Sequence, residues 1–318
     1  RLEARVAAAA QGSRTGELAR SDRADDVMAA AGELDGRATF GLPELDALLD
    51  GGLTRGTSTL IVGSLGTGKT MLALHFALAG ARAGEPTLFL GFRESHRQLL
   101  VKAEPFAMAV ELRAALAPRG GLTLMRWSPV EVNPDILAHQ LLETIDATGT
   151  KRLVVDSAAE VERAVADTGV PQRVDNYLAA LVEALRMRGV TAVFTKEIPQ
   201  TTAPELDFAQ NPISVMAENV LLLRQVERRD RLVRVLSVLK MRFSAHDTGT
   251  VREFVIAPPG GVRVLPAGEG STVGLPERGG APPAGARGQR RGGTRETRET
   301  REPGSFPGSD DETPEGLP

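Results

Sequence analysis

The sequence predicts an α/β protein with a mostly parallel sheet, flanking helices and antiparallel strands added at the C-terminal end. Three observations support this fold class. Short apolar segments rich in β-branched residues alternate with helical stretches between residues 39 and 266. A glycine-rich loop joins the first buried-type strand to the helix that follows it. The last strands follow one another without intervening helices, which favours antiparallel pairing.

The strand "STLIVG" at 58–63 is short, β-branched and bounded by glycine, and the next elements alternate regularly after it. Further strands are expected at 87–92, 122–127, 152–157 and 190–197. Helices are expected at 69–84, 95–117, 135–149 and 174–189. Strands joined by helices imply a parallel sheet with helices on both faces. Two hairpins are expected to follow, within 218–242 and within 251–266.

The composition is that of an ordinary globular protein, with 318 residues, 42% hydrophobic and 25% charged. A net charge of −3 gives no overall basic footprint and makes nucleic acid an unlikely partner. The chain has no cysteine, which excludes disulfides, thiolate zinc sites and cysteine nucleophiles. It shows neither a signal peptide nor an apolar run long enough for a membrane span, so a cytoplasmic location without membrane attachment is expected.

Three segments with different compositions divide the chain. Residues 1–37 are rich in Ala, Arg and Asp and are expected to form a helical lead-in or linker. Residues 38–266 carry the alternating pattern and form the predicted folded domain. Residues 267–318 are a charged tail rich in Gly and Pro that contains the repeat "TRETRETRE". Such a composition buries too little apolar surface to offset the entropy of ordering, so this tail is expected to be disordered.

Residues 63–70, "GSLGTGKT", match the phosphate-binding pattern G-x-x-x-x-G-K-[ST] between a predicted strand and a predicted helix. The lysine of this loop, Lys69, supplies positive charge to the β- and γ-phosphates, and Thr70 supplies a hydroxyl to Mg²⁺. The helix that begins near Lys69 adds its positive end to the site. The pattern predicts ATP and Mg²⁺ as cofactors. The predicted nucleotide-binding residues here are Gly63, Ser64, Leu65, Gly66, Thr67, Gly68, Lys69, Thr70 and Met71.

An acidic residue, Asp156, ends the apolar strand "RLVVDS". The carboxyl ends of parallel strands form the edge of the sheet that carries ligands. An acid in this position often only caps a helix. Beside a phosphate loop, a role as the second metal ligand is the better interpretation, so Asp156 joins Thr70 in the predicted Mg²⁺ site.

The stretch "FGLPELDALLDGGLTRGTSTLIVGSLGTGKT" resembles the start of a KaiC-type domain of the RecA-like ATPases. The resemblance continues through "LFLGFRES", "RLVVDS", "VTAVFTKE", "ISVMAENVLLLR" and "VLKMRFSAHD". It covers about residues 38–265, nearly all of the predicted folded part. It implies a RecA-like P-loop NTPase core that binds and hydrolyses ATP.

Domains of that family assemble into hexameric rings with ATP between adjacent subunits, so the resemblance implies a homo-oligomer. It also implies that the strand "KMRFSAH" reaches the nucleotide of the neighbouring subunit. Side chains two residues apart on a strand share a face, and cations supplied in trans offset phosphoryl charge. A solvated strand face is the alternative. The residues implied in this trans role are Lys240, Met241, Arg242, Ser244 and His246. Phe106 matches a position beside the adenine, although a core phenylalanine explains it nearly as well.

The stretch "GFRES" departs from the family pattern. Members usually carry two adjacent glutamates here, and the first orients the attacking water. In this chain the first position is Arg93, which cannot accept a proton, and only Glu94 remains as the candidate catalytic base. Either Glu94 substitutes, or hydrolysis is slow and the protein acts as a switch that responds to bound ATP. Pairing of Arg93 with Glu94 would weaken Glu94 as a base further.

Autophosphorylation, a second activity of the family, uses a Ser-Thr pair near the subunit interface. The corresponding stretch is "PISVMAEN", in which Ser214 matches the serine but Val215 replaces the threonine. This replacement disfavours autokinase activity.

Three functional classes fit the sequence. The first is a ring-assembling ATP-binding protein that hydrolyses ATP slowly and signals to partner proteins. The second is a RecA-like DNA-binding recombination or repair ATPase. The absence of Lys and Arg from "PQTTAPELDFAQNP" argues against that class. The third is a nucleotide-dependent scaffold with negligible hydrolysis, which Arg93 favours.

Overall fold

The computed structural model describes residues 36–128, 132–169, 173–198, 217–228, 231–244 and 250–266. The predicted lead-in and the predicted tail lie outside these residues, apart from Gly36 and Arg37. Ser214, Val215 and His246 lie outside them as well. Among the helices that are described, none is long and apolar enough to cross a membrane.

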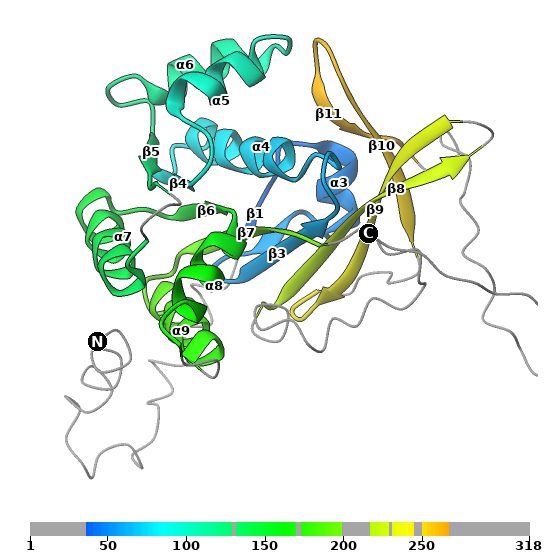
Figure 1. Cartoon of the computed structure of the whole chain (residues 1–318). Helices are drawn as coiled ribbons and strands as arrows, with labels where there is room; N and C mark the ends of the chain where they lie inside the picture. Colours follow the sequence, from blue (N-terminus) through cyan, green and yellow to red (C-terminus); the bar gives the residue numbers. More distant parts are fainter. Residues whose placement is uncertain are drawn as a thin grey trace, which may run out of the picture. The chain divides into compact units, whose positions relative to one another are not determined.

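A nine-stranded sheet with the order β11-β10-β9-β8-β3-β7-β6-β4-β5 forms the centre of the fold (Figure 1). Its parallel part comprises β3 (Ser58–Gly63), β4 (Thr87–Gly91), β5 (Leu122–Arg126), β6 (Arg152–Asp156), β7 (Thr191–Glu197) and β8 (Asn219–Arg228). The added strands β9 (Arg231–Met241), β10 (Val251–Ala257) and β11 (Gly261–Val264) pair antiparallel with their neighbours. The predicted fold class and both predicted hairpins are confirmed.

Helices cover both faces of this sheet. The first face carries α4 (Lys69–Arg82), α5 (His96–Ala103) and α6 (Met108–Leu116). The second face carries α7 (Pro134–Thr148), α8 (Ala158–Ala166) and α9 (Arg173–Arg186). The single helical stretch expected at 95–117 is wrong, because Pro105 lies between α5 and α6 and has no backbone N–H with which to continue the hydrogen bonds of α5.

A short segment ahead of β3 contains β1 (Arg37–Ala38), α3 (Pro43–Leu48) and β2 (Leu53–Thr54), with β1 and β2 paired antiparallel. The Asp46 carboxylate accepts hydrogen bonds from the backbone N–H groups of Phe40 and Leu42, which closes the chain around the start of α3. Phe40 and Leu45 are fully buried in the same core as helix α4. The segment is therefore packed onto the domain.

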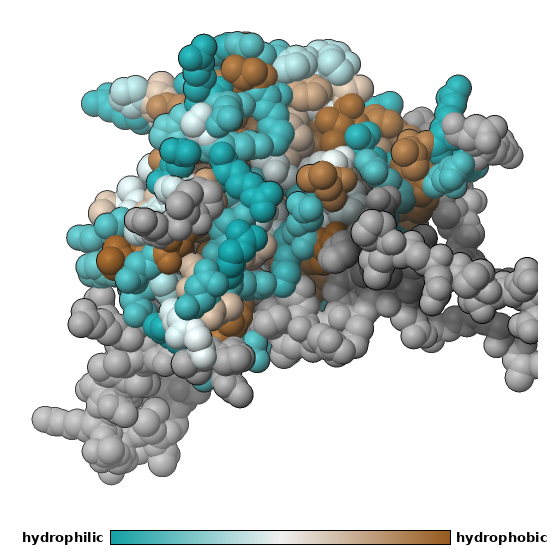
Figure 2. Space-filling view, viewed as in Figure 1, coloured by the Kyte–Doolittle hydropathy of each residue, from teal (hydrophilic) through white to brown (hydrophobic). Residues whose placement is uncertain are grey.

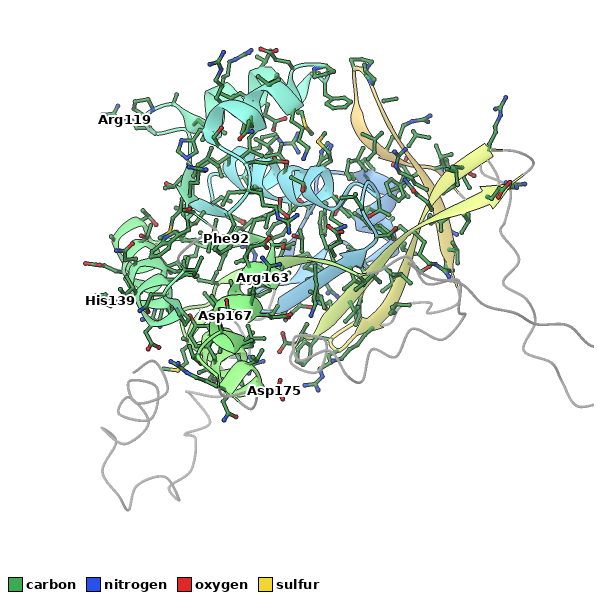
Figure 3. The ribbon with its side chains drawn as sticks, viewed as in Figure 1. Phe92, Arg119, His139, Arg163, Asp167 and Asp175 are labelled. Atoms are coloured by element: carbon green, nitrogen blue, oxygen red, sulfur yellow. The ribbon has the colours of Figure 1, made fainter. Side chains whose placement is uncertain are left out.

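Two hydrophobic clusters, one on each face of the sheet, result from the alternation of side chains along the strands. In β3, Ile61 joins the cluster under α4, whereas Leu60 and Val62 join the cluster under α7–α9. Phe92, directly after β4, is fully buried in the second cluster. Figure 3 shows it in the interior of the molecule, whereas Arg119 lies at the edge.

Arg152, at the start of β6, is a charged side chain buried inside the domain, with 1% of its surface exposed. Its Nε donates to Glu85 Oε2 at 2.5 Å, and its Nη1 donates to the carbonyl of Thr39 at 2.6 Å. The guanidinium also lies 4.8 Å from the ring centroid of Phe76, within cation–π range. Glu85 in turn is bonded to Arg55. This network ties the segment before β3 to the sheet and to α4.

Replacing Glu85 by glutamine is expected to lower the free energy of unfolding by about 3 kcal/mol, because it leaves the buried charge of Arg152 without its counter-charge. Urea denaturation measures this loss. The matched control is Glu104→Gln, since Glu104 pairs with Arg113 and both side chains are more than half exposed. Its loss is expected to be within about 0.5 kcal/mol. If both variants lost the same free energy of unfolding, Glu85 would not be the group that compensates the buried charge of Arg152.

Candidate active site

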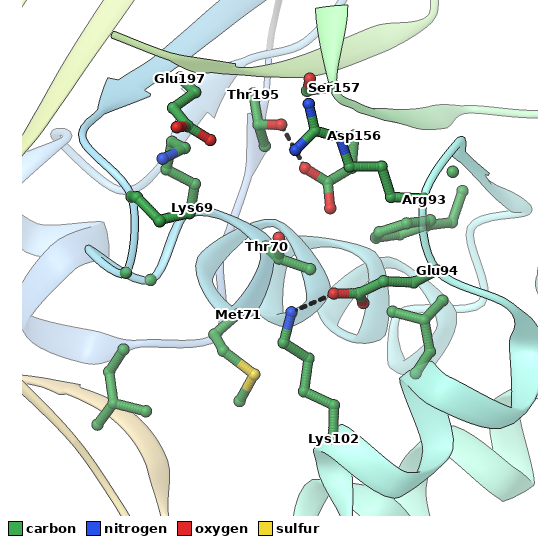
Figure 4. Close-up of a pocket in the computed structure, with 17 residues that line it drawn as sticks. Lys69, Thr70, Met71, Arg93, Glu94, Lys102, Asp156, Ser157, Thr195 and Glu197 are labelled. Atoms are coloured by element: carbon green, nitrogen blue, oxygen red, sulfur yellow. Dashed lines mark hydrogen bonds and ion pairs between the residues drawn. The ribbon is translucent and has the colours of Figure 1, made fainter. Parts of the chain in front are cut away.

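A cavity of about 430 Å³ opens where the parallel strands β3, β4, β6 and β7 end (Figure 4). Its walls come from the phosphate loop, the start of α4, the residues that follow β4 and the ends of β6 and β7. Sheets of this type bind ligands at the carboxyl ends of their strands. The predicted residues Leu65, Gly66, Gly68, Lys69, Thr70, Met71, Glu94 and Asp156 all line it.

The loop that follows β3 has the backbone that the glycine pattern predicts. Gly66 and Gly68 have φ angles of 76° and 103°, a region in which side-chain-bearing residues are strained. A Cβ on Gly68 would also lie 2.4 Å from Ile256 Cδ1, so β10 packs closely against the loop. Thr67 Oγ1 donates to the carbonyl of Ser64 at 2.8 Å and closes the turn. Gly68 directly precedes α4, whose N-terminal N–H groups therefore face the cavity.

Lys69, the first residue of α4, folds along this loop. Its Nζ donates to the carbonyls of Gly63 at 2.8 Å and Ser64 at 2.7 Å. Burial lowers the pKa of Lys69, while the charges of Glu197 and Asp156 act in the opposite direction. Figure 4 shows the carboxylate of Glu197 beside the lysine amine. The ammonium group is thus held at the mouth of the loop, next to the N–H groups that bind phosphate in such loops.

Asp156 and Thr70 come together as the predicted metal ligands. Thr70 donates a side-chain hydrogen bond to Asp156, and Thr195 Oγ1 donates a second one. Burial raises the pKa of Asp156, and these two hydrogen bonds oppose that shift. A hydroxyl and a carboxylate side by side suit Mg²⁺, which takes one or two protein ligands and completes its shell with phosphate oxygens and water. The described residues contain no cluster of three or more potential metal ligands.

Glu94, the candidate base, lies in the cavity wall and forms an ion pair with Lys102 of α5, whose Nζ is 2.5 Å from its Oε1. Its other oxygen, Oε2, is buried and has no hydrogen-bond partner among the described residues. One carboxylate oxygen is thus held by a lysine, and the second remains available to accept a proton or a water hydrogen.

Arg93 does not pair with Glu94, so that part of the hypothesis is wrong. Its Nε donates to Glu160 Oε1 at 2.6 Å. Glu160 is buried on α8, and the hydroxyl of Ser157 donates to its second oxygen. Helix α8 was not predicted, so this partner could not be found from the sequence. The hydrogen bond and charge of Glu160 raise the pKa of Arg93.

Four of the other predicted residues lie away from this cavity. Lys240 Nζ donates to the carbonyl of Ala217 at 2.7 Å. Met241 is buried and Arg242 is exposed. Ser244 Oγ donates to Asp50 Oδ2 at 2.9 Å.

The register of the sheet shows how far these residues are from the phosphate loop. Met241 pairs with Asn219, which pairs with Thr59 at the start of β3. The loop follows Gly63, four residues farther along that strand and therefore roughly 13 Å away. Lys240 and Arg242 thus lie at the opposite end of the sheet from their own phosphate loop.

Phe106 packs, partly buried, against the core cluster under α4 and is not among the cavity-lining residues. Its proposed place beside the adenine remains a prediction.

Five polar residues at or beside the cavity were not predicted: Lys102, Ser157, Glu160, Thr195 and Glu197. Glu197 ends the apolar strand β7 as Asp156 ends β6, so the same strand-end argument would have found it. Thr195 lies two residues earlier on the same strand face. Lys102 and Glu160 come from helices, and no local pattern marks which helical charges turn toward a sheet edge.

The fold and the site together define a P-loop nucleotide-binding protein with a RecA-like core. A family model described as "ATPase: KaiC" matches residues 38–269, so the chain belongs to the KaiC family of ATPases.

Curated relatives agree with this family. The "Circadian clock oscillator protein KaiC" of Thermostichus vulcanus is 28% identical over 224 residues, which cover 70% of this chain and 42% of that protein. The protein of the same name from a Nostoc species is 30% identical over 232 residues, which cover 70% of this chain and 43% of that protein. The chain therefore spans less than half the length of these relatives.

Proposed function

We propose that this protein binds ATP with Mg²⁺, hydrolyses it slowly and acts as a ring-assembling signalling switch with nucleotide at its subunit interfaces. The observation that carries this proposal is the arrangement around the phosphate loop. Lys69 lies at the loop, Asp156 and Thr70 meet beside it, and Lys240 and Arg242 lie at the far end of the sheet. A cytoplasmic location and signalling proteins as partners belong to the same proposal.

Slow hydrolysis follows from the two residues at the end of β4. Arg93 cannot serve as a base, and Glu94, the proposed base, has one oxygen bound to Lys102. General-base catalysis typically contributes a factor of about 10²–10⁴, so a partly engaged base leaves a weak ATPase. The same ion pair favours the second candidate, a nucleotide-dependent scaffold with negligible hydrolysis.

Assembly with ATP between subunits is supported by the position of Lys240 and Arg242 at the end of β9. Lys240 and Arg242 lie too far from their own phosphate loop to contact its nucleotide, but they can contact a nucleotide bound by a neighbouring subunit. Two large apolar side chains, Leu232 and Phe243, are 70% and 52% exposed near the two ends of β9. On the face shown in Figure 2, hydrophobic residues gather toward the side of β8–β11, while the helical side is mostly hydrophilic. This side is the proposed subunit contact.

Mass photometry with and without ATP and Mg²⁺, combined with phosphate release, tests assembly and catalysis together. The wild type is expected to shift from small species to rings when ATP is added. Arg242→Ala is expected to lower phosphate release at least tenfold, because a cation that offsets phosphoryl charge in trans is lost. Arg231→Ala removes an exposed arginine from the opposite end of β9 and is expected to behave like the wild type. A wild type that remains monomeric with ATP and Mg²⁺ would contradict the proposal.

A further inference from the structure

The guanidinium of Arg93 is a fixed cation at the wall of the nucleotide cavity. Arg93 follows β4 at the ligand-bearing edge of the sheet, and its side chain crosses toward Asp156 and Thr195 in Figure 4. Although 61% of this side chain is exposed, its Nε is held by a carboxylate that is only 2% exposed. The exposed part of Arg93 therefore has a defined position at the cavity.

Two hydrogen bonds in series fix this position. Glu160 accepts from Arg93 Nε through one oxygen and from the Ser157 hydroxyl through the other. Ser157 directly follows Asp156, so the chain of contacts ends next to the proposed metal ligand. A buried carboxylate with both oxygens occupied has little freedom to move, and the guanidinium inherits its orientation.

The terminal nitrogens of Arg93 remain available for a ligand. Within the part of the chain that the structure describes, Nε is the only atom of this guanidinium with a hydrogen-bond acceptor. The two Nη groups carry four N–H donors in a planar fork. Such a fork matches the oxygens of a phosphate group and binds them with charge-assisted hydrogen bonds.

The charge balance of the cavity depends on this residue. The side chains that line it include three cations, Lys69, Arg93 and Lys102, and three carboxylates, Glu94, Asp156 and Glu197. A glutamate in place of Arg93 would change the charge of the wall by two units toward negative. With Arg93 the charges of the lining side chains balance, so no net negative charge of the wall opposes a polyanionic ligand.

We propose that Arg93 binds the terminal phosphate group of a nucleoside triphosphate within its own subunit, and that Glu160 is the residue that positions it. Arg93 thereby makes the cavity selective for triphosphate over diphosphate. This inference rests on the proposed ATP-binding function and adds a selectivity device to it. A protein of this kind reports the presence of ATP even when hydrolysis is slow.

Isothermal titration with Mg²⁺ and either ADP or a non-hydrolysable ATP analogue tests the assignment. Arg93→Gln is expected to weaken binding of the analogue about tenfold or more, because charge-assisted hydrogen bonds to one phosphate are lost. Its affinity for ADP is expected to stay as in the wild type. Arg97→Gln is the matched control, since Arg97 is exposed on α5 and does not line the cavity. Its affinity for both nucleotides is expected to stay unchanged.

A double-mutant cycle tests the positioning role of Glu160. Glu160→Gln alone is expected to weaken binding of the ATP analogue, as Arg93→Gln does. The double variant is expected to bind no more weakly than Arg93→Gln alone, because the two residues act through one contact. If the losses of binding free energy in the two single variants simply added up in the double variant, the positioning role of Glu160 would be overturned.

The outcomes separate this inference from the proposed function. A wild type that binds neither nucleotide overturns both. A wild type that prefers the analogue, with the same preference in Arg93→Gln, overturns only the role of Arg93. Circular dichroism confirms that each variant is folded, and the exposed side chain of Arg93 makes its replacement structurally mild.

Discussion

Replacing Lys69 by methionine is expected to weaken ATP binding about a hundredfold or more and to abolish measurable phosphate release. The side chain of Lys69 lies along the phosphate loop, where burial already limits how the charge is solvated. Methionine keeps the apolar stem and removes only the ammonium group, so the loss measures its hydrogen bonds to phosphate. Isothermal titration and a phosphate-release assay provide the two readouts.

Lys151→Met is the matched control for this variant. Lys151 is exposed just before β6, and it is not among the residues that line the cavity. Its affinity for ATP is expected to equal that of the wild type. If Lys69→Met bound ATP as tightly as this control, the cavity at the phosphate loop would not be the nucleotide site.

Replacing Glu94 by glutamine is expected to lower phosphate release about a hundredfold while ATP binding changes little. Glutamine preserves the shape of the side chain but cannot accept a proton, so the loss isolates base catalysis. Single-turnover phosphate release, measured beside titration with ATP, separates the chemical step from binding. Glu104→Gln, at an exposed carboxylate that follows α5, is the control for loss of one negative charge.

Unchanged turnover in Glu94→Gln would show that Glu94 is not the base. Negligible turnover in the wild type itself would favour the scaffold over the slow ATPase. Arg93→Glu restores the carboxylate that the family pattern expects. Under the slow-ATPase proposal, that variant is expected to release phosphate faster than the wild type when ATP is saturating, although loss of the Arg93 cation weakens its affinity for ATP.

The parallel sheet was predictable because its strands carry a strong local signal. β3, β6 and β7 are short and have a buried centre of apolar, often β-branched residues, and β6 and β7 end in an acidic residue while β3 ends in a glycine. The helix α8 was missed, because it is only nine residues long and a single residue, Ser157, separates it from β6. The break between α5 and α6 was missed despite Pro105, since the apolar pattern continues on both sides of it.

The candidate site was predictable where its residues belong to the strands or to the phosphate loop. Lys69, Thr70 and Asp156 were expected together, and the structure brings them together. The partners of the two unusual residues were not predictable. Lys102 and Glu160 are charged residues on helices, and their pairing with Glu94 and Arg93 depends on how those helices pack. Only the tertiary structure supplies that information.

The phosphate loop and the pair Lys240 and Arg242 lie at opposite ends of the sheet, so each subunit has a loop end and a cation end. If ATP bridges subunits as proposed, the loop end of one subunit contacts the cation end of the next. Such a heterologous contact either closes into a ring or continues as an open filament. Every open assembly then leaves one phosphate loop without the cations of a neighbouring subunit, and only a closed ring completes all nucleotide sites. The occupancy of ATP would therefore depend on protein concentration as well as on ATP concentration, through mass action.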